Sequence, residues 1–317
     1  KYIISFISLL FFYLFYLSIP NLYDKTWVQN TIENKLLEEF NINFSISSEI
    51  SYNILPSPHF LIKNSKVFRP DDGKTNSLAE IKKLKIFISQ KNFFTKEKMY
   101  IKSVLIKDAN FNLYELDFNL LDKLNDKKLS NKKIDMIKSK IFFKDSSDKT
   151  YAIVKMSKAV LFSDKQELLN ILDLTGEVFN LPFSLSLNQT IFSSDVSEVI
   201  RKVNISSNKI KLKIFNKSTI KLTDIISGLN NTTILNFKIA TKYNINKNRN
   251  EITFMSSESE VKDLSISYNG KLSTEPFDLS LDINLSKIEI AKILNNNSLF
   301  FELLKTQLFF NENLSAD

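Results

Sequence analysis

The hydrophobic pattern of this chain begins with a run of eighteen residues, 2–19, in which no side chain is charged. At a helical rise of about 1.5 Å per residue the run is roughly 27 Å long, close to the roughly 30 Å of hydrocarbon in a bilayer. A cleaved secretory signal usually has a shorter apolar core, and a buried core helix keeps a polar stripe. We therefore predict an uncleaved transmembrane anchor over residues 1–21, ended by Pro20, with Tyr23 and Trp27 at the membrane–water interface.

The pattern then changes to apolar residues at steps of four, in Val28, Ile32, Leu36 and Phe40. This spacing predicts one amphipathic helix that ends near Phe40. Such a helix could either pack against the end of the following sheet or bind to a membrane surface. Its charges are mixed in sign, which favours packing against the sheet.

From residue 42 onward apolar residues alternate with polar ones, which is typical of strands with one dry and one wet face. The alternation predicts strands over residues 60–68, 84–89, 100–107, 111–115, 137–143, 151–162, 181–187, 203–206, 210–215, 234–241, 252–255, 264–268 and 277–285. Residues 123–133 have no apolar period and are predicted as a solvated loop, and two short helices are predicted over 288–294 and 299–304. The apolar face of such a sheet has to be covered, either by a second sheet or by a greasy ligand in a curled sheet.

Two segments share the frame G-x5-P-F-x-L-S-L, and their first residues are Gly176 and Gly270. Glycine can adopt turn angles, and the prolines Pro182 and Pro276 start a strand, where a missing N–H does least harm. The same hairpin is therefore predicted twice, which suggests a sheet that is extended by repetition.

The formal net charge is +8, and only three of the 43 basic residues are arginine. The planar guanidinium fork is the group that reads bases and phosphates, so this bias disfavours specific nucleic-acid binding. The lysine excess is consistent with an affinity for anionic membrane surfaces. The chain has no cysteine, which excludes disulfides, thiolate catalysis and cysteine metal sites.

No pattern of catalytic residues is present in the sequence. His59 is the only histidine, which excludes a zinc site with two histidines, and it lies in a turn where we expect a surface position. Asp71 and Asp72 lack the spaced carboxylates of a calcium loop, and there is no glycine-rich phosphate loop. We predict no enzymatic activity, no cofactor and no metal.

The order of these features is more specific than any one of them. After the anchor and the amphipathic helix come the pair Pro56 and Pro58, the strand 60–67, a basic strand at 78–89, the elbow Phe93-Phe94 and the strands within 101–113. In this order the chain resembles the AsmA-like family of Gram-negative envelope proteins. The resemblance is best over residues 1–115 and extends in part over residues 170–305.

The resemblance implies a mainly β fold: an N-terminal transmembrane helix and a short amphipathic helix, then an elongated curled antiparallel sheet, a taco-like groove, with few short helices. Residues 22–120 correspond to the family's N-terminal helix and first strands, and residues 121–317 to the continuing repeat-like groove, truncated at its C-terminus. The family's single-pass proteins sit in the inner membrane with the body in the periplasm. Their implied activity is to guide phospholipid between the inner and outer membranes, with membrane lipids and envelope proteins as partners and no nucleic acid.

A groove of this kind would shelter acyl chains on apolar side chains of its strands. The residues predicted to line it are Leu84, Ile86, Ile88, Phe111, Leu113, Phe183, Leu185, Leu187, Ile210, Leu212, Ile214, Phe277, Leu279 and Leu281. A second hypothesis, of a different class, is an anchored assembly or interaction protein whose sheet edge pairs with another envelope protein and which moves no lipid itself.

Overall fold

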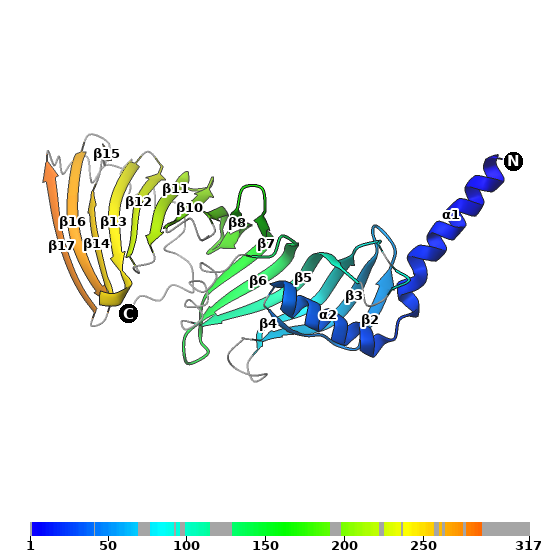
Figure 1. The fold of residues 1–317 in the computed structure, drawn as a ribbon. Coiled ribbons are helices and arrows are strands. Elements are labelled where there is room, and N and C mark those ends of the chain that lie inside the picture. The colour runs from blue at the N-terminus through cyan, green and yellow to red at the C-terminus, as the bar shows by residue number, and fades with distance from the viewer. Residues whose placement is uncertain are drawn as a thin grey trace. The chain divides into compact units, whose positions relative to one another are not determined.

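The structure is a computed structural model that describes residues 2–40, 42–68, 77–91, 93–95, 99–114, 129–190, 198–221, 225–235, 237–256, 260–261, 264–274 and 277–286. Over these residues the chain is mainly β, with few helices and strands that pair antiparallel in all but one case, which confirms the predicted fold class. The chain forms two compact units (Figure 1). The first contains residues 1–118 and 129–163, and the second contains residues 119–128 and 164–317.

The first unit begins with the apolar helix α1 (Tyr2–Ser18), followed by a short 3-10 helix, η1 (Ile19–Leu22). The residues of α1 up to Phe15 are all exposed. Pro20 lies within η1, so α1 ends just before it, as a residue without a backbone N–H requires. The stretch Tyr2–Leu22 is long and apolar enough to cross a membrane.

The amphipathic helix α2 (Lys25–Phe40) begins at an aspartate cap. The Oδ1 atom of Asp24 accepts a hydrogen bond from the backbone N–H of Trp27 at 2.8 Å, which satisfies one of the N–H groups that the start of a helix leaves free. The helix buries Val28, Ile32 and Leu36, which are spaced four apart. These side chains belong to the core of the first unit, so α2 packs against the sheet as predicted (Figure 1).

The sheet of the first unit has these strands among the described residues: β1 (Asn43–Ser45), β2 (Ile50–Asn53), β3 (His59–Phe68), β4 (Ser77–Ile88), β5 (Ile101–Tyr114), β6 (Lys133–Lys144) and β7 (Thr150–Asp164). Strands β1 and β2 both pair with β3, and β3, β4 and β5 pair in sequence, all antiparallel. Strand β6 is parallel to β5 and antiparallel to β7. One apolar cluster joins the buried face of α2 to inward side chains of β3, β4 and β5, which gives this part of the sheet a closed core.

A row of left-handed residues crosses this sheet. Asn64 in β3, Asp108 in β5 and Lys138 in β6 have φ of 55°, 55° and 52°. The strand registers on both sides of these residues place them in line across β3 to β6. Residues other than glycine rarely adopt a positive φ, and here each shifts the side-chain alternation of its strand by one position. We call this row the crease.

The shift keeps the same face of the sheet apolar on both sides of the crease. Ile106 and Ala109 in β5 are both buried although they lie three residues apart, and so are Ile81 and Leu84 in β4. A strict period of two would place one member of each pair on the wet face. For this reason the sequence predicts two strands, at 100–107 and 111–115, where the structure has the single strand β5.

A buried hydroxyl satisfies the backbone at the crease. The Oγ atom of Ser139 accepts a hydrogen bond from the backbone N–H of Ala109 at 3.1 Å and donates one to the carbonyl oxygen of Ile137 at 3.0 Å. Ser139 and Ala109 are both buried, so water does not replace these bonds.

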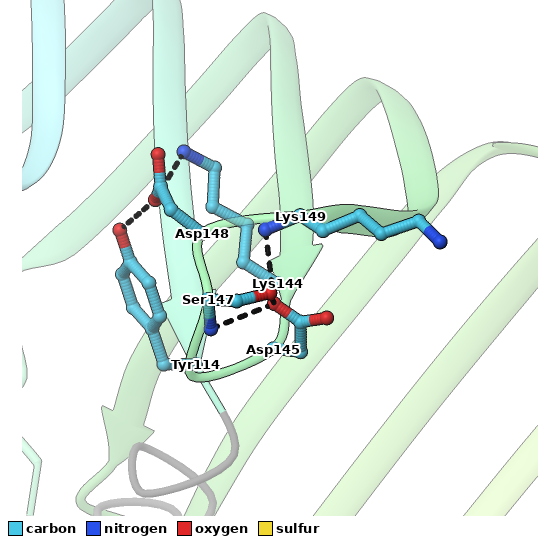
Figure 2. Close-up of polar contacts among 6 residues, drawn as sticks. All are labelled: Tyr114, Lys144, Asp145, Ser147, Asp148 and Lys149. Atoms are coloured by element: carbon cyan, nitrogen blue, oxygen red, sulfur yellow. Dashed lines mark hydrogen bonds and ion pairs between the residues drawn. The ribbon is translucent and has the colours of Figure 1, made fainter.

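The turn between β6 and β7 is organised by Asp145 (Figure 2). Its Oδ1 atom accepts hydrogen bonds from the backbone N–H groups of Ser147 and Lys149, both at 2.9 Å, and from the Ser147 hydroxyl at 2.7 Å. These hydrogen bonds, the one from the Ser147 hydroxyl first, favour the ionised carboxylate and lower the pKa of Asp145.

A second aspartate ties this turn to the end of β5 (Figure 2). Asp148 accepts a hydrogen bond from the hydroxyl of Tyr114 at 2.5 Å and forms an ion pair with Lys144 at 3.0 Å. The bond from Tyr114 and then the one from Lys144 lower the pKa of Asp148, and the bond to Asp148 raises the pKa of Lys144. Since Tyr114 is the last residue of β5, this contact holds β5 and the turn together.

The second unit has these strands among the described residues: β8 (Leu169–Val178), β9 (Leu181–Thr190), β10 (Glu198–Ser207), β11 (Leu212–Lys221), β12 (Ile225–Ile234), β13 (Phe237–Asn246), β14 (Glu251–Ser256), β15 (Glu260–Val261), β16 (Leu264–Thr274) and β17 (Phe277–Ser286). Each long strand pairs antiparallel with the next one along the chain, and β14 pairs directly with β16. The sequence did not predict β8 or β12, and its strand at 234–241 is divided by a turn at Leu235. The helices predicted over 288–294 and 299–304 lie outside the described residues.

The two copies of the repeated sequence frame form hairpins with different registers. Gly176 of β8 pairs with Phe183 of β9. The corresponding Gly270 of β16 pairs instead with Leu281 of β17. The residues that the two frames have in common therefore occupy different positions in the two hairpins. The frame does not define a structural repeat.

We predict that Ser139→Ala lowers the free energy of unfolding by about 1–3 kcal/mol, because the buried N–H of Ala109 loses its acceptor. The matched control is Ser65→Ala in β3, whose buried hydroxyl has no hydrogen-bond partner in the part of the chain that the structure describes. That substitution should cost less than about 0.5 kcal/mol or stabilise the protein. Denaturant unfolding of the full chain in detergent measures both, and equal costs would contradict this account of the crease.

We predict that Asp148→Asn increases amide hydrogen exchange in the turn 145–149 at neutral pH and that this effect becomes smaller as the pH falls below about 3.9. The folded state lowers the pKa of Asp148, so its stabilisation is complete above the unfolded carboxyl pKa of about 3.9 and is lost as the pH falls through the lower folded value. Tyr114→Phe, which removes one of the two donors, should show a smaller effect with the same pH dependence. A difference that persisted at low pH would count against an electrostatic origin.

Candidate functional site

One face of the second unit carries most of its apolar side chains. Residues that pair directly across an antiparallel sheet point to the same side, so the registers define which side chains share this face. It carries Leu172, Leu174, Phe183, Leu185, Leu187, Val199, Val203, Ile205, Leu212, Ile214, Ile220, Ile226, Tyr243, Ile245, Ile252, Phe254, Tyr268, Leu272, Phe277, Leu279, Leu281 and Ile283. We call it the apolar face. The opposite side of the same strands carries mainly lysine, serine, asparagine and aspartate, as in Lys213, Lys217 and Lys221 of β11.

A row of aliphatic side chains runs across this face at right angles to the strands. Each member pairs directly with the next, and in order from β10 to β17 they are Val199, Ile220, Ile226, Ile245, Ile252, Leu272 and Leu279. Neighbouring strands lie about 4.8 Å apart, so seven strands give a row roughly 29 Å long. We call it the aliphatic row. It is long enough to accommodate an extended acyl chain of a common phospholipid.

Most side chains of the apolar face are half-buried, and those on β17 are exposed. Only Val199, Ile220 and Ile226 form a buried apolar cluster in the described part of the second unit, in contrast to the large core of the first. On β17 the exposed fractions of Leu279 and Leu281 are 51% and 45%. Side chains of this size are normally covered in a folded protein, so the face is suited to an apolar ligand or partner.

Beside the aliphatic row lies a band of polar side chains on the same face. It contains Asn170, Gln189, Arg201 and Ser218 in one cross-strand row and Asn216, Asn230, Thr241 and Ser256 in the next. The Nε atom of Arg201 donates a hydrogen bond to Oε1 of Gln189 at 3.0 Å. On the far side of the band the face is apolar again, at Leu185, Ile205 and Ile214.

Within this band, two aromatic rings lie against the backbone of glycine residues in the neighbouring strands. The ring of Tyr243 in β13 lies across Gly228 in β12, and its hydroxyl exchanges hydrogen bonds with the side-chain amide of Asn216 in β11 at 2.9 and 3.0 Å. A Cβ atom at Gly228 would lie 2.4 Å from the ring, so only glycine allows this approach. The ring of Phe254 covers Gly270 in the same way. The two glycines therefore allow the rings to lie close to the backbone at the centre of the face.

The structure places eight of the predicted groove residues on the apolar face. Phe183, Leu185, Leu187, Leu212 and Ile214 are half-buried there, and Phe277, Leu279 and Leu281 are exposed. Ile210 does not belong to them. It is buried in the turn between β10 and β11, because the left-handed Lys211 begins β11 later than the alternation suggests.

In the first unit the prediction needs a correction. Leu84, Ile86 and Ile88 of β4 are at most 2% exposed and belong to the core that the buried face of α2 shares, so they do not line an open groove. Phe111 and Leu113 lie beyond the crease and are half-buried. Alternation alone does not distinguish strand residues under a helix from those on an open face.

The predicted interface residues Tyr23 and Trp27 pack onto the body of the first unit. Both are half-buried against its core, and their ring centroids lie 5.4 Å apart. The hydroxyl of nearby Tyr52 donates a hydrogen bond to the carbonyl oxygen of Leu17, at the end of α1, at 2.6 Å. Burial, with a smaller contribution from Tyr23, raises the pKa of Tyr52. These aromatic residues therefore connect the anchor helix to the sheet.

The described residues contain no cluster of three or more side chains that could hold a metal ion. His59, expected at the surface, is only 2% exposed; its Nδ1 atom lies 2.8 Å from the carbonyl oxygen of Ser57 and its ring packs on Phe87. The expectation was wrong because His59 is the first residue of β3, where it pairs with Asn53 of β2 and Phe87 of β4. A side chain held in this way has a structural role.

No protein-family model matches this chain, and no curated protein matches its sequence.

We predict that Ile86→Ala lowers the free energy of unfolding of the first unit by about 2–5 kcal/mol, because it leaves a cavity in a closed core. The matched substitution Leu279→Ala, on the apolar face, should change the stability of the second unit by less than about 1 kcal/mol. Denaturant-dependent amide hydrogen exchange of the full chain in detergent resolves the two units. A large cost at Leu279 would indicate that the face is closed.

Proposed function

We propose that this protein is a membrane-anchored lipid-binding protein whose apolar face shelters phospholipid acyl chains and guides lipid between the inner and outer membranes of a Gram-negative envelope. The observation that carries the proposal is the aliphatic row, seven side chains paired from strand to strand, which is buried at its β10 end and exposed at Leu279 of β17. The order of sequence features that resembles the AsmA-like family supports it.

Energetics favour an acyl chain as the ligand of this face. Each methylene taken from water contributes about 0.8 kcal/mol, so about six sheltered methylenes offset roughly 5 kcal/mol of the cost of moving a lipid through water. The open side of the face leaves a charged headgroup in contact with solvent, where its solvation is kept. A face of this kind binds lipids by apolar area and does not require a specific pocket.

The helix α1 supplies the membrane attachment in this proposal. It would hold the protein in the inner membrane by a single pass, with both units in the periplasm. Because no energy-coupling residue is identified in the sequence, lipid would move passively or through a partner protein.

The competing hypothesis is that the apolar face or a sheet edge binds another envelope protein and that no lipid is carried. The two hypotheses differ in what contacts the apolar face in cells. A protein partner would cover it with side chains, whereas a lipid-binding face would contact acyl chains.

We predict that a photo-crosslinking amino acid at Leu279, introduced into the full chain in cells, forms phospholipid adducts detectable by mass spectrometry. The matched control is the same group at Ser280, which is also exposed but lies on the opposite face of β17, and a second control is Ile86 in the closed core. Lipid adducts should form at Leu279 and not at either control. Protein adducts alone at Leu279 would favour the competing hypothesis and reject this one.

A further inference from the structure

Three tyrosines at the end of α1 and just after it hold the loop that follows β4. The hydroxyl of Tyr13 donates a hydrogen bond to Oε1 of Gln90 at 3.1 Å. The hydroxyl of Tyr16 donates to the carbonyl oxygen of Gln90 at 2.6 Å and accepts from the N–H of Phe93 at 3.3 Å. The hydroxyl of Tyr23 donates to the carbonyl oxygen of Phe93, and the rings of Tyr16 and Phe93 stack. Gln90 and Phe93 therefore lie along the last turns of α1. We call the described residues 89–91 and 93–95 the loop.

The position of this loop along α1 sets its depth relative to a membrane. Tyr16, whose ring stacks on Phe93, precedes Leu22, the last residue of the apolar stretch, by six residues, which is roughly 9 Å of helix. If Tyr2–Leu22 spans a bilayer, the loop lies level with the last two turns of the span. Amphipathic segments insert to a similar depth, about 5–10 Å into the boundary between headgroups and acyl chains.

Large apolar side chains project around the junction of α1 with the sheet. Leu22 of η1, Leu55 in the turn after β2 and Phe94 in the loop have exposed fractions of 79%, 80% and 79%. The ring of Phe94 lies 5.4 Å from that of Tyr16, and η1 contacts β2. All three residues are therefore close to the end of the anchor.

Three backbone polar groups of the loop have partners within the protein. In lipid, backbone N–H and C=O groups need partners within the protein. The tyrosine hydroxyls of the anchor provide partners for the carbonyl oxygen of Gln90 and for both backbone groups of Phe93. The exposed lysines Lys25 and Lys91 flank the apolar side chains and suit anionic headgroups.

We propose that Leu55 and Phe94, next to Leu22 at the end of the span, form a second membrane attachment, in which the turn at Leu55 and the loop at Phe94 insert into the headgroup boundary of the same bilayer that α1 spans. The occupant of this surface is the lipid bilayer, because the surface is continuous with the anchor. This inference rests on the proposed anchoring by α1. Two attachments would hold the first unit at a fixed tilt and keep its sheet from swivelling about the anchor.

The absence of cysteine from the chain allows a direct test with single-cysteine variants of the full protein. The variants Phe94→Cys and Leu55→Cys carry an environment-sensitive fluorophore and are reconstituted in nanodiscs of phosphatidylcholine with phosphatidylglycerol. Lipids with a quencher near the top of the acyl chain should quench both labels several-fold more than a label at Tyr151→Cys. Tyr151 is also an exposed aromatic residue, but it begins β7 beside the turn 145–149, at the opposite end of the strands.

A label at Phe6→Cys, within α1, distinguishes the two ways in which the inference can fail. Quenching at Phe6 with none at Phe94 and Leu55 would leave the anchor in place and overturn the second attachment. No quenching at any of these positions would overturn the anchoring and the second attachment together. Quenching at Phe6, Phe94 and Leu55, with little at Tyr151, is the expected result.

Discussion

The structure depends on how each unit removes the apolar face of its sheet from water. In the first unit the helix α2 covers that face, and Val28, Ile32 and Leu36 join the strands in one closed core. In the second unit the described strands pair only along the sheet, and the buried apolar cluster is limited to three residues. The aliphatic row is therefore only partly covered and is exposed at β17, which in water is unfavourable unless a ligand or partner covers it. The proposed lipid binding follows from this difference between the two units.

Residues with unusual backbone or packing requirements shape both faces. At the crease, the left-handed Asn64, Asp108 and Lys138 shift the alternation of their strands by one position. The same face of the sheet therefore remains apolar before and after the crease. On the apolar face, Gly228 and Gly270 allow aromatic rings to lie flat on the backbone. The left-handed residues keep the apolar core continuous across the crease. The glycines let the rings of Tyr243 and Phe254 lie close to the backbone of the apolar face. Neither depends on a catalytic or metal-binding group.

The helix α1 is joined to the folded body of the first unit by hydrogen bonds and packing. Tyr52 bonds to the last turn of α1, and the tyrosines of α1 and the residues after it bond to the loop that follows β4. Through these contacts the orientation of α1 is coupled to the sheet of the first unit. In the proposed function the same contacts would set how that sheet meets the inner membrane.

The sequence by itself determined the apolar helix, the amphipathic helix and the mainly antiparallel β body, because each has a strong local period. It missed β1, β2, β8, β12 and β15. It also joined two strands across Leu235 and split β5 at Asp108, since a single left-handed residue breaks or shifts the alternation without a clear change in composition. Of the aliphatic row, only Leu279 was among the predicted groove residues, and Ile86, which was also predicted, lies in a closed core. Alternation states which side chains share a face of one strand. Only the tertiary structure decided which residues align across strands and which face α2 covers, because register and layer packing arise from contacts between segments far apart in the chain.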